Sequence, residues 1–159
     1  MKKMFSVCLI LILTSAAVMA EHAISSKKNP EFLYVLSASS GSLEGETLRL
    51  TDIPMVVYFS DRPSRIAGHM SLKDFLQGYN KGSDSFKADP PNGILSVYTP
   101  KGNDNIVVEI RNLELKGNVL ICSVRILEGN TFSSFKNASL FIDSSCESVQ
   151  SPACRHGTF

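Results

Sequence analysis

The side chains best suited to chemistry lie between Tyr58 and His69. This segment follows an apolar run and gathers an acid, two guanidinium groups, two hydroxyls and an imidazole within ten residues. Arg62 and Arg65 could form a forked site for a carboxylate or phosphate, because guanidinium donors match those oxygens in bidentate geometry. With Asp61, His69 and Tyr58 they make a candidate binding site for an anionic small molecule, glycan or envelope component.

The same residues are compatible with a structural role and with hydrolysis. In the structural role, Asp61 pairs with one arginine, Arg65 covers the end of the sheet with its aliphatic stem, and His69 fixes the entry to the helix that follows. In hydrolysis, Ser60 or Ser64 would act with His69 and an acid. The sequence has no GxSxG elbow, HExxH helix or paired-carboxylate pattern to support hydrolysis, so an enzyme is the weaker hypothesis.

The first twenty residues predict export. Lys2 and Lys3 precede an apolar stretch, and Val18-Met19-Ala20 is a small-x-small cleavage site, which are the three parts of a secretory signal peptide. The stretch is shorter than a membrane-spanning helix requires, and no second one follows. We expect a bacterial protein found in the periplasm or secreted, without stable membrane insertion.

Export decides how the cysteines are interpreted. Cys146 and Cys154 share a polar C-terminal tail, and outside the cytosol such a pair tends to form a disulfide. Cys122 lies in an apolar run and is expected in the core. A metal site from Cys146, Cys154 and His156 is the alternative, but the C-x7-C-x-H spacing matches no common zinc site, and no cofactor is predicted.

Composition narrows the partner classes. The 159 residues are 43% hydrophobic and 19% charged, with a formal charge of +1 that becomes −1 when Lys2 and Lys3 leave with the signal peptide. A near-neutral chain gives no electrostatic reason to expect nucleic acid as a partner. The oligomeric state does not follow from the sequence.

Most of the remaining chain alternates between apolar and polar residues, the pattern of half-buried strands. Gly45 and Gly117 lie in hairpin turn signals, and the serine-rich stretch 39–42 is expected to interrupt the first strand. The expected strands are 32–38, 48–50, 55–59, 94–98, 106–115, 119–127 and 138–143. In the strand at 106–115 the apolar phase changes near Asn112, as a β-bulge would produce.

A single helix is predicted at about residues 71–80. Ser71 and Asp74 resemble a capping box. An apolar stripe at helical spacing follows, formed by Leu72, Phe75, Leu76 and Tyr79. Such a stripe is the usual means of docking a helix on a sheet.

These elements predict one mainly β domain, an antiparallel β-sandwich or barrel-like fold with one short amphipathic helix. We expect a signal peptide at 1–20, a flexible leader at 21–30, the β-rich domain at 31–143 and a tail at 144–159. An exposed sheet edge in such a fold would support a third function, an envelope structural or protein-interaction domain.

The segments 43–45, 47–54, 58–69, 89–92 and 138–143 resemble those of a family of small exported bacterial proteins of unknown function. The most specific motif is YFSDRPxRxAGH at 58–69. The resemblance covers most of residues 32–143 and implies a shared domain without assigning a chemistry.

Overall fold

The alternating segments form the strands of one antiparallel sheet. A computed structural model describes residues 30–79, 86, 88–100 and 102–145. Its elements are β1 (Glu31–Glu44), β2 (Thr47–Thr51), β3 (Val56–Ser60), β4 (Ala67–Met70), α2 (Leu72–Tyr79), β5 (Asn92–Thr99), β6 (Gly102–Lys116), β7 (Val119–Glu128) and β8 (Phe135–Ser145). The predicted mainly β class with one short helix is confirmed.

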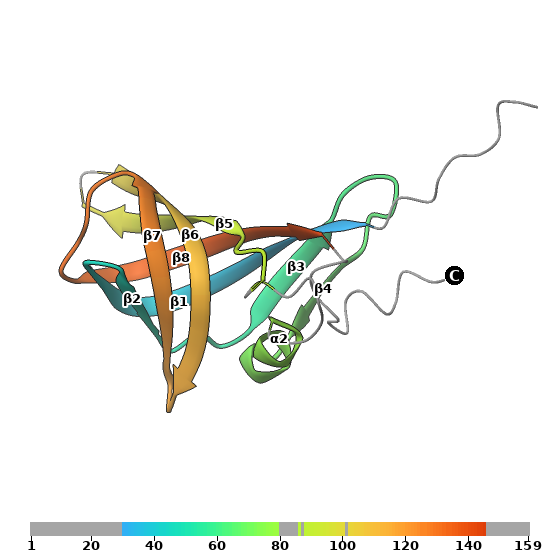
Figure 1. Cartoon of the computed structure of the whole chain (residues 1–159), viewed down its shortest axis with the longest axis horizontal. Helices are drawn as coiled ribbons and strands as arrows, with labels where there is room; N and C mark the ends of the chain where they lie inside the picture. The colour runs from blue at the N-terminus through green and yellow to red at the C-terminus, as the bar shows by residue number, and fades with distance from the viewer. Residues whose placement is uncertain (1–29, 80–85, 87, 101, 146–159) are drawn as a thin grey trace, which may run out of the picture.

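Six of these strands close into a ring. The sheet order is β2-β7-β6-β5-β8-β1-β3-β4, and an additional pairing between β2 and β1 joins the two ends of the six-stranded part. The barrel-like alternative therefore describes this fold, and the ring is visible on the left of Figure 1. Because the ring is closed, β1 and β2 have no unpaired backbone edge where they join.

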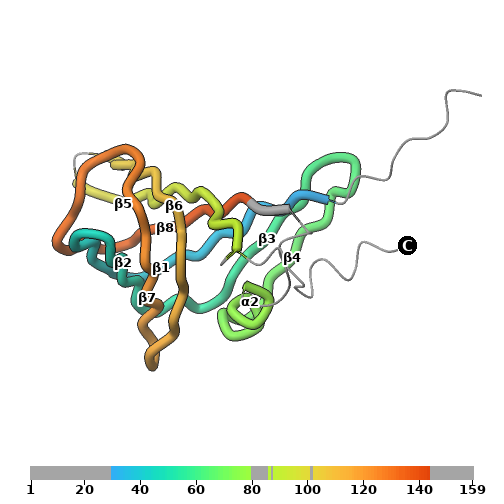
Figure 2. Tube along the Cα trace, in the orientation of Figure 1, coloured from blue at the N-terminus to red at the C-terminus, as the bar shows by residue number. Residues whose placement is uncertain are grey.

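Strand β1 organises the sheet because one of its two edges has a different neighbour along each half of the strand. It pairs with β8 over nearly its whole length, with β3 through residues 32–36 and with β2 through residues 40–44. The β3–β4 hairpin consequently extends the sheet beyond the ring, as the tube in Figure 2 shows.

Along both β1 and β8, the alternation between buried and exposed side chains shifts by one residue at the same place in the sheet. Between Phe32 and Ala38 the buried residues of β1 have even numbers, whereas the buried Leu43 has an odd number. In β8 the buried residues Phe135 and Ala138 are three positions apart, which is likewise a change between odd and even numbers. Asn137, between these two β8 positions, has a φ of 52°, in the left-handed region that asparagine tolerates. The joint change keeps the β1–β8 pairing in register while the strands bend around the ring.

The predicted phase change in β6 is confirmed. The β6–β7 register shifts between Ile110 and Asn112, and a second shift lies between Val107 and Val108. The two hairpin turns are also as predicted: Gly45 and Gly117 have φ values of 57° and 63°, which glycine adopts without steric cost.

Helix α2 begins where its cap predicts. The Ser71 hydroxyl donates to the Asp74 carboxylate at 2.7 Å and accepts from the Asp74 backbone N–H at 3.1 Å. Phe75 and Tyr79 are buried, and the Tyr79 hydroxyl donates to the Ile110 carbonyl of β6 at 3.3 Å. The helical stripe is therefore core, as predicted.

An aromatic cluster joins the helix to the sheet. Its rings come from β1, β3, α2 and the segment after the helix, with neighbouring centroids 4.8 to 6.5 Å apart. The members are Phe32, Tyr34, Tyr58, Phe75, Tyr79 and Phe86. Offset and edge-to-face pairs of this kind add about 0.5–1.5 kcal/mol each beyond area burial.

Two expectations about strand limits are wrong. Residues 39–42 do not interrupt the first strand, because β2 and β8 supply backbone partners on both sides of β1 there. Strand β8 starts three residues earlier than expected and includes Ser144 and Ser145, which the sequence assigns to the tail. The signal peptide, most of the leader and the rest of the tail lie outside the described residues.

Candidate functional site

The segment from Tyr58 to His69 folds as a β-hairpin, and its second strand, β4, is not among the strands that the sequence predicts. Strand β4 pairs with β3, with Tyr58 opposite Gly68 and Val57 opposite His69. The sequence hides β4 because Ala67 to Met70 has no run of apolar alternation. Its pairing depends on backbone groups, which every residue but proline provides.

Hydrogen bonds anchor the turn of this hairpin. The Ser60 N–H donates to the Ile66 carbonyl, and the Ile66 N–H donates to the Ser60 hydroxyl, both at 2.7 Å. The Glu31 N–H donates to the Asp61 carboxylate at 3.2 Å, and the Asp61 N–H donates to the Glu31 carbonyl at 3.0 Å. Asp61 therefore joins the turn to the start of β1, and no ion pair between it and an arginine is found in the described part of the chain.

Arg62 and Arg65 project from this anchored turn, and both are exposed. The Arg62–Pro63 peptide bond is cis, and Arg65 adopts a φ of 51° while its N–H donates to the Asp61 carbonyl at 3.1 Å. Hydrogen bonding thus fixes the backbone between the two guanidinium groups, and the side chains extend from a defined base.

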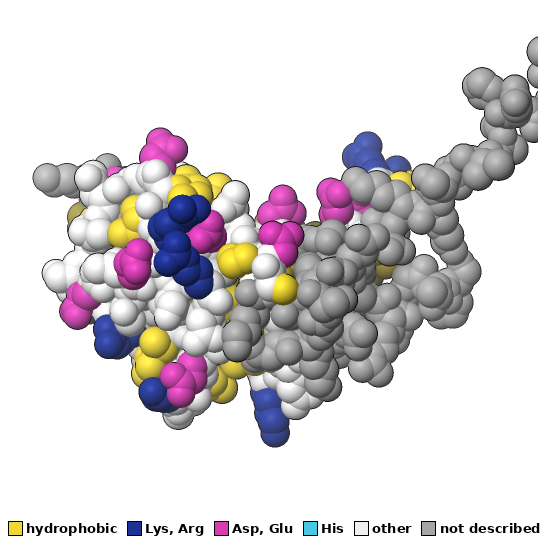
Figure 3. Space-filling view, viewed as in Figure 1, with side chains coloured by type: hydrophobic (Ala, Val, Ile, Leu, Met, Phe, Trp, Pro, Cys, Tyr) yellow, Lys and Arg dark blue, Asp and Glu magenta, His cyan; other side chains and the backbone are white. Residues whose placement is uncertain are grey.

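Each of the other described arginines has a carboxylate within 4.0 Å. Arg49 lies 3.9 Å from the Glu44 carboxylate, whereas Arg111 and Arg125 bind the Glu109 carboxylate at 3.0 and 2.5 Å. The hydrogen bond from Arg111, aided by Arg125, holds the pKa of Glu109 below its usual range. Figure 3 shows basic and acidic side chains side by side on the visible face of the ring.

Tyr58 and His69 lie on opposite faces of the hairpin. Tyr58 shares the face of Val56 and packs against Phe32, with ring centroids 5.9 Å apart, whereas His69 is paired with Val57 and is exposed on the other face. Side chains alternate between faces along a strand, so these two groups cannot meet one ligand within the hairpin. The turn thus carries Asp61, Arg62 and Arg65, whereas Tyr58 and His69 lie on opposite faces of the hairpin.

The same alternation bears on hydrolysis. The Ser60 hydroxyl accepts from Ile66 and donates to the Asp61 carbonyl at 3.2 Å, on the face opposite His69. A nucleophile needs a base within hydrogen-bond reach. Ser60 and His69 do not have this arrangement.

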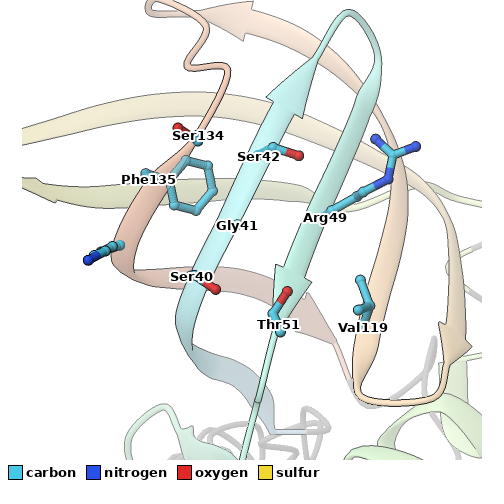
Figure 4. Close-up of a pocket in the computed structure, with 9 residues that line it drawn as sticks. Ser40, Gly41, Ser42, Arg49, Thr51, Val119, Ser134 and Phe135 are labelled. Carbon is cyan, nitrogen blue, oxygen red and sulfur yellow. The ribbon is translucent and has the colours of Figure 1, made fainter.

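Sequence reasoning missed two hollows on the outer face of the ring. The larger, about 590 Å³, lies across β8, β1 and β2, and its lining includes Arg49, Lys136 and several hydroxyls around the Gly41 backbone (Figure 4). The smaller, about 360 Å³, lies across β1, β8, β5 and β6 and includes Tyr98. The residues come from segments up to about a hundred positions apart, so only strand pairing reveals them.

The remaining predictions about cysteines divide between two regions. Cys122 is free and fully buried, as predicted, and burial raises the pKa of its thiol. Cys146, Cys154 and His156 lie outside the described residues. Within the described ranges no three His, Cys, Asp or Glu side chains are placed to hold a metal ion, and no helix has the length and apolar character to cross a membrane.

Comparison with known proteins yields no matching family model, no matching curated protein and no matching solved structure.

Proposed function

We propose that this protein is a non-catalytic binding module that recognises an anionic small molecule, glycan or envelope component through Arg62 and Arg65. One observation carries the proposal. Of the five arginines in the described ranges, these two alone have no carboxylate within 4.0 Å there. They are three residues apart on a turn that backbone hydrogen bonds at Ser60, Asp61, Arg65 and Ile66 anchor.

The anchored turn preorganises the backbone of the proposed site. An anion that binds here does not have to displace an internal carboxylate, because Asp61 is occupied by the Glu31 backbone N–H. The anchored turn also reduces the backbone entropy that would be lost on binding. Two guanidinium groups can then supply charge-assisted hydrogen bonds to one carboxylate or phosphate.

NMR titration with inorganic phosphate and with acetate tests the proposal. We expect amide shifts concentrated at residues 61–66, and we expect them to disappear in the Arg62→Gln/Arg65→Gln double variant. The matched control is Arg111→Gln/Arg125→Gln, which removes the same charge from two arginines that already bind Glu109. Equal shifts in both double variants, or none at the turn in the unmodified protein, would refute the proposal.

A second candidate function is favoured by the position of β4. This strand ends the described sheet, with β3 on one side and no described strand on the other. A partner could add a strand there through main-chain hydrogen bonds, the mode by which exposed edges recruit other chains. The Ser60–Ile66 hydrogen bond and the β3–β4 register place the Gly68 N–H toward β3 and the His69 N–H toward the outer edge. A His69→Pro variant would therefore remove a backbone donor from that edge, and unchanged partner binding by that variant would count against edge pairing.

We also propose that the protein is exported and shares a domain with the family that its 58–69 motif resembles. The signal-like residues 1–20 support export. Mass spectrometry of the protein recovered from the periplasm tests it, because cleavage after Ala20 would leave Glu21 at the N-terminus.

A further inference from the structure

The two hollows on the outer face of the ring adjoin along the β1–β8 pair. Both are lined by outward-facing residues of the same two strands, and Ser37 pairs with Ser139 while Ser40 pairs with Lys136. We call the uncharged polar residues of β1 and of residues 134–139 that line the two hollows the serine strip. Its members are Ser37, Ser40, Ser42, Ser134, Asn137 and Ser139.

The serine strip offers many hydrogen-bonding groups and no charge. Each hydroxyl can donate and accept, and the Oγ atoms of Ser37 and Ser139 lie 3.1 Å apart. Residues 37–42 extend over about 17 Å at strand spacing, more than a single small molecule would cover. A ligand rich in hydroxyl groups and longer than one ring fits this surface.

One end of the strip carries an exposed aromatic ring. Tyr98 on β5 is 69% exposed and lines the smaller hollow with Phe141, Ser96 and Asn103. Within the described ranges, no charged side chain lines that hollow. A rigid aromatic face next to amide and hydroxyl groups can pack on the C–H face of a sugar ring while its neighbours bind the ring's hydroxyls.

The other end carries positive charge. Lys136 on β8 and Arg49 on β2 flank the larger hollow, and no acid is among its lining residues. Lys136 has no carboxylate within 4.0 Å among the described residues, and Arg49 is held only by Glu44 at 3.9 Å. Figure 4 shows the Ser40, Ser42 and Thr51 hydroxyls around Gly41.

We propose that the serine strip binds an acidic oligosaccharide, with a sugar ring on Tyr98 and a carboxylate, sulfate or phosphate group between Lys136 and Arg49. The charges at one end and the neutral hydroxyl and aromatic groups at the other are complementary to such a ligand. A neutral glycan would leave the two cations unused, and a small free anion would leave the strip and Tyr98 unused. This site is separate from the Arg62–Arg65 turn and does not depend on it.

An array of acidic and neutral oligosaccharides, followed by titration of the tightest binder, tests the proposal. We expect binding to acidic oligosaccharides alone, with the dissociation constant raised about tenfold or more by Tyr98→Ala and by Lys136→Gln, and weakened by salt. Leu127→Ala and Lys116→Gln are the matched controls, because they remove an exposed apolar side chain and an exposed lysine elsewhere on the ring. Thermal melts of all four variants confirm that they are folded.

Three results would overturn the assignment: no acidic oligosaccharide on the array bound, equal binding of neutral oligosaccharides, or binding that Tyr98→Ala and Lys136→Gln leave unchanged. The Arg62→Gln/Arg65→Gln variant separates this proposal from the turn site. It should keep its oligosaccharide affinity here even if it loses every response to phosphate.

Discussion

Gly41 lies where β1 is paired on both sides, opposite Leu50 of β2 and Phe135 of β8. A Cβ atom added there would lie 2.3 Å from the Arg49 carbonyl oxygen and 2.6 Å from the Phe135 ring. Real Cβ atoms essentially never approach another heavy atom closer than 3.0 Å. The Gly41→Ala variant must therefore move β1 against a neighbouring backbone, which cannot rotate away as a side chain can.

The size of the effect follows from that displacement. The shortfall from 3.0 Å to 2.3 Å is 0.7 Å, and stretching an N–H···O bond of about 2.9 Å by this amount takes it beyond hydrogen-bonding distance. Each lost ladder bond costs about 1 kcal/mol, so one or two such bonds together with strain give about 1–3 kcal/mol. The melting temperature should fall by roughly 4 °C for each kcal/mol in a domain of this size.

Urea unfolding followed by circular dichroism measures this cost. Ser42→Ala is the matched control, because it changes a neighbouring side chain on the outer face and should alter the free energy of unfolding by less than about 0.5 kcal/mol. Phe135→Leu should not rescue Gly41→Ala, since the Arg49 carbonyl remains in place. A Gly41→Ala protein within about 0.5 kcal/mol of the unmodified chain would refute the reasoning.

Three further predictions concern the core and the helix. Tyr79→Phe removes the hydroxyl that donates to the Ile110 carbonyl and should lower the free energy of unfolding by about 1 kcal/mol; no change would show that this bond is not stabilising. Burial raises the pKa of the Cys122 thiol, so the unfolded chain releases this proton first and stability should fall as pH rises above about 8.5. Cys122→Ala should lose less stability between about pH 7.5 and about pH 10 than the unmodified protein, and an identical loss would contradict this origin. Ser71→Ala should destabilise by about 1 kcal/mol through loss of the helix cap at Asp74, whereas Ser71→Asp should largely retain stability, as thermal melts can compare.

The sequence predicted the elements whose signals are local. Alternation identified most strands, the capping residues located α2 at Ser71, and the phase change near Asn112 located a real bulge. Each of these signals depends on neighbours within a few positions in the chain. The pairings of β2 with β7 and of β1 with β8 complete the ring, but they join residues that are distant in sequence, so no local pattern reports them.

The candidate site shows the same limit. The sequence places Arg62 and Arg65 in one short segment, but separating Tyr58 from His69 requires the β3–β4 register. The serine strip was invisible for a related reason. The sequence pattern suggests a break in the strand at Ser40 and Ser42, and the β8 partners of this part of β1 lie almost a hundred residues later.

The two ends of the ring domain have a mechanical consequence. Glu31 at the start of β1 pairs with Ser145 at the end of β8, so the chain enters and leaves the domain at one corner (Figure 1). Tension applied through the flanking segments would act on the end of a single antiparallel pair. It would separate the β1–β8 hydrogen bonds one after another, as a zipper opens, instead of loading them all at once. The domain should accordingly unfold at low force when it is pulled by its ends. A force applied between two internal turns would instead load many strand pairs of the closed ring at once.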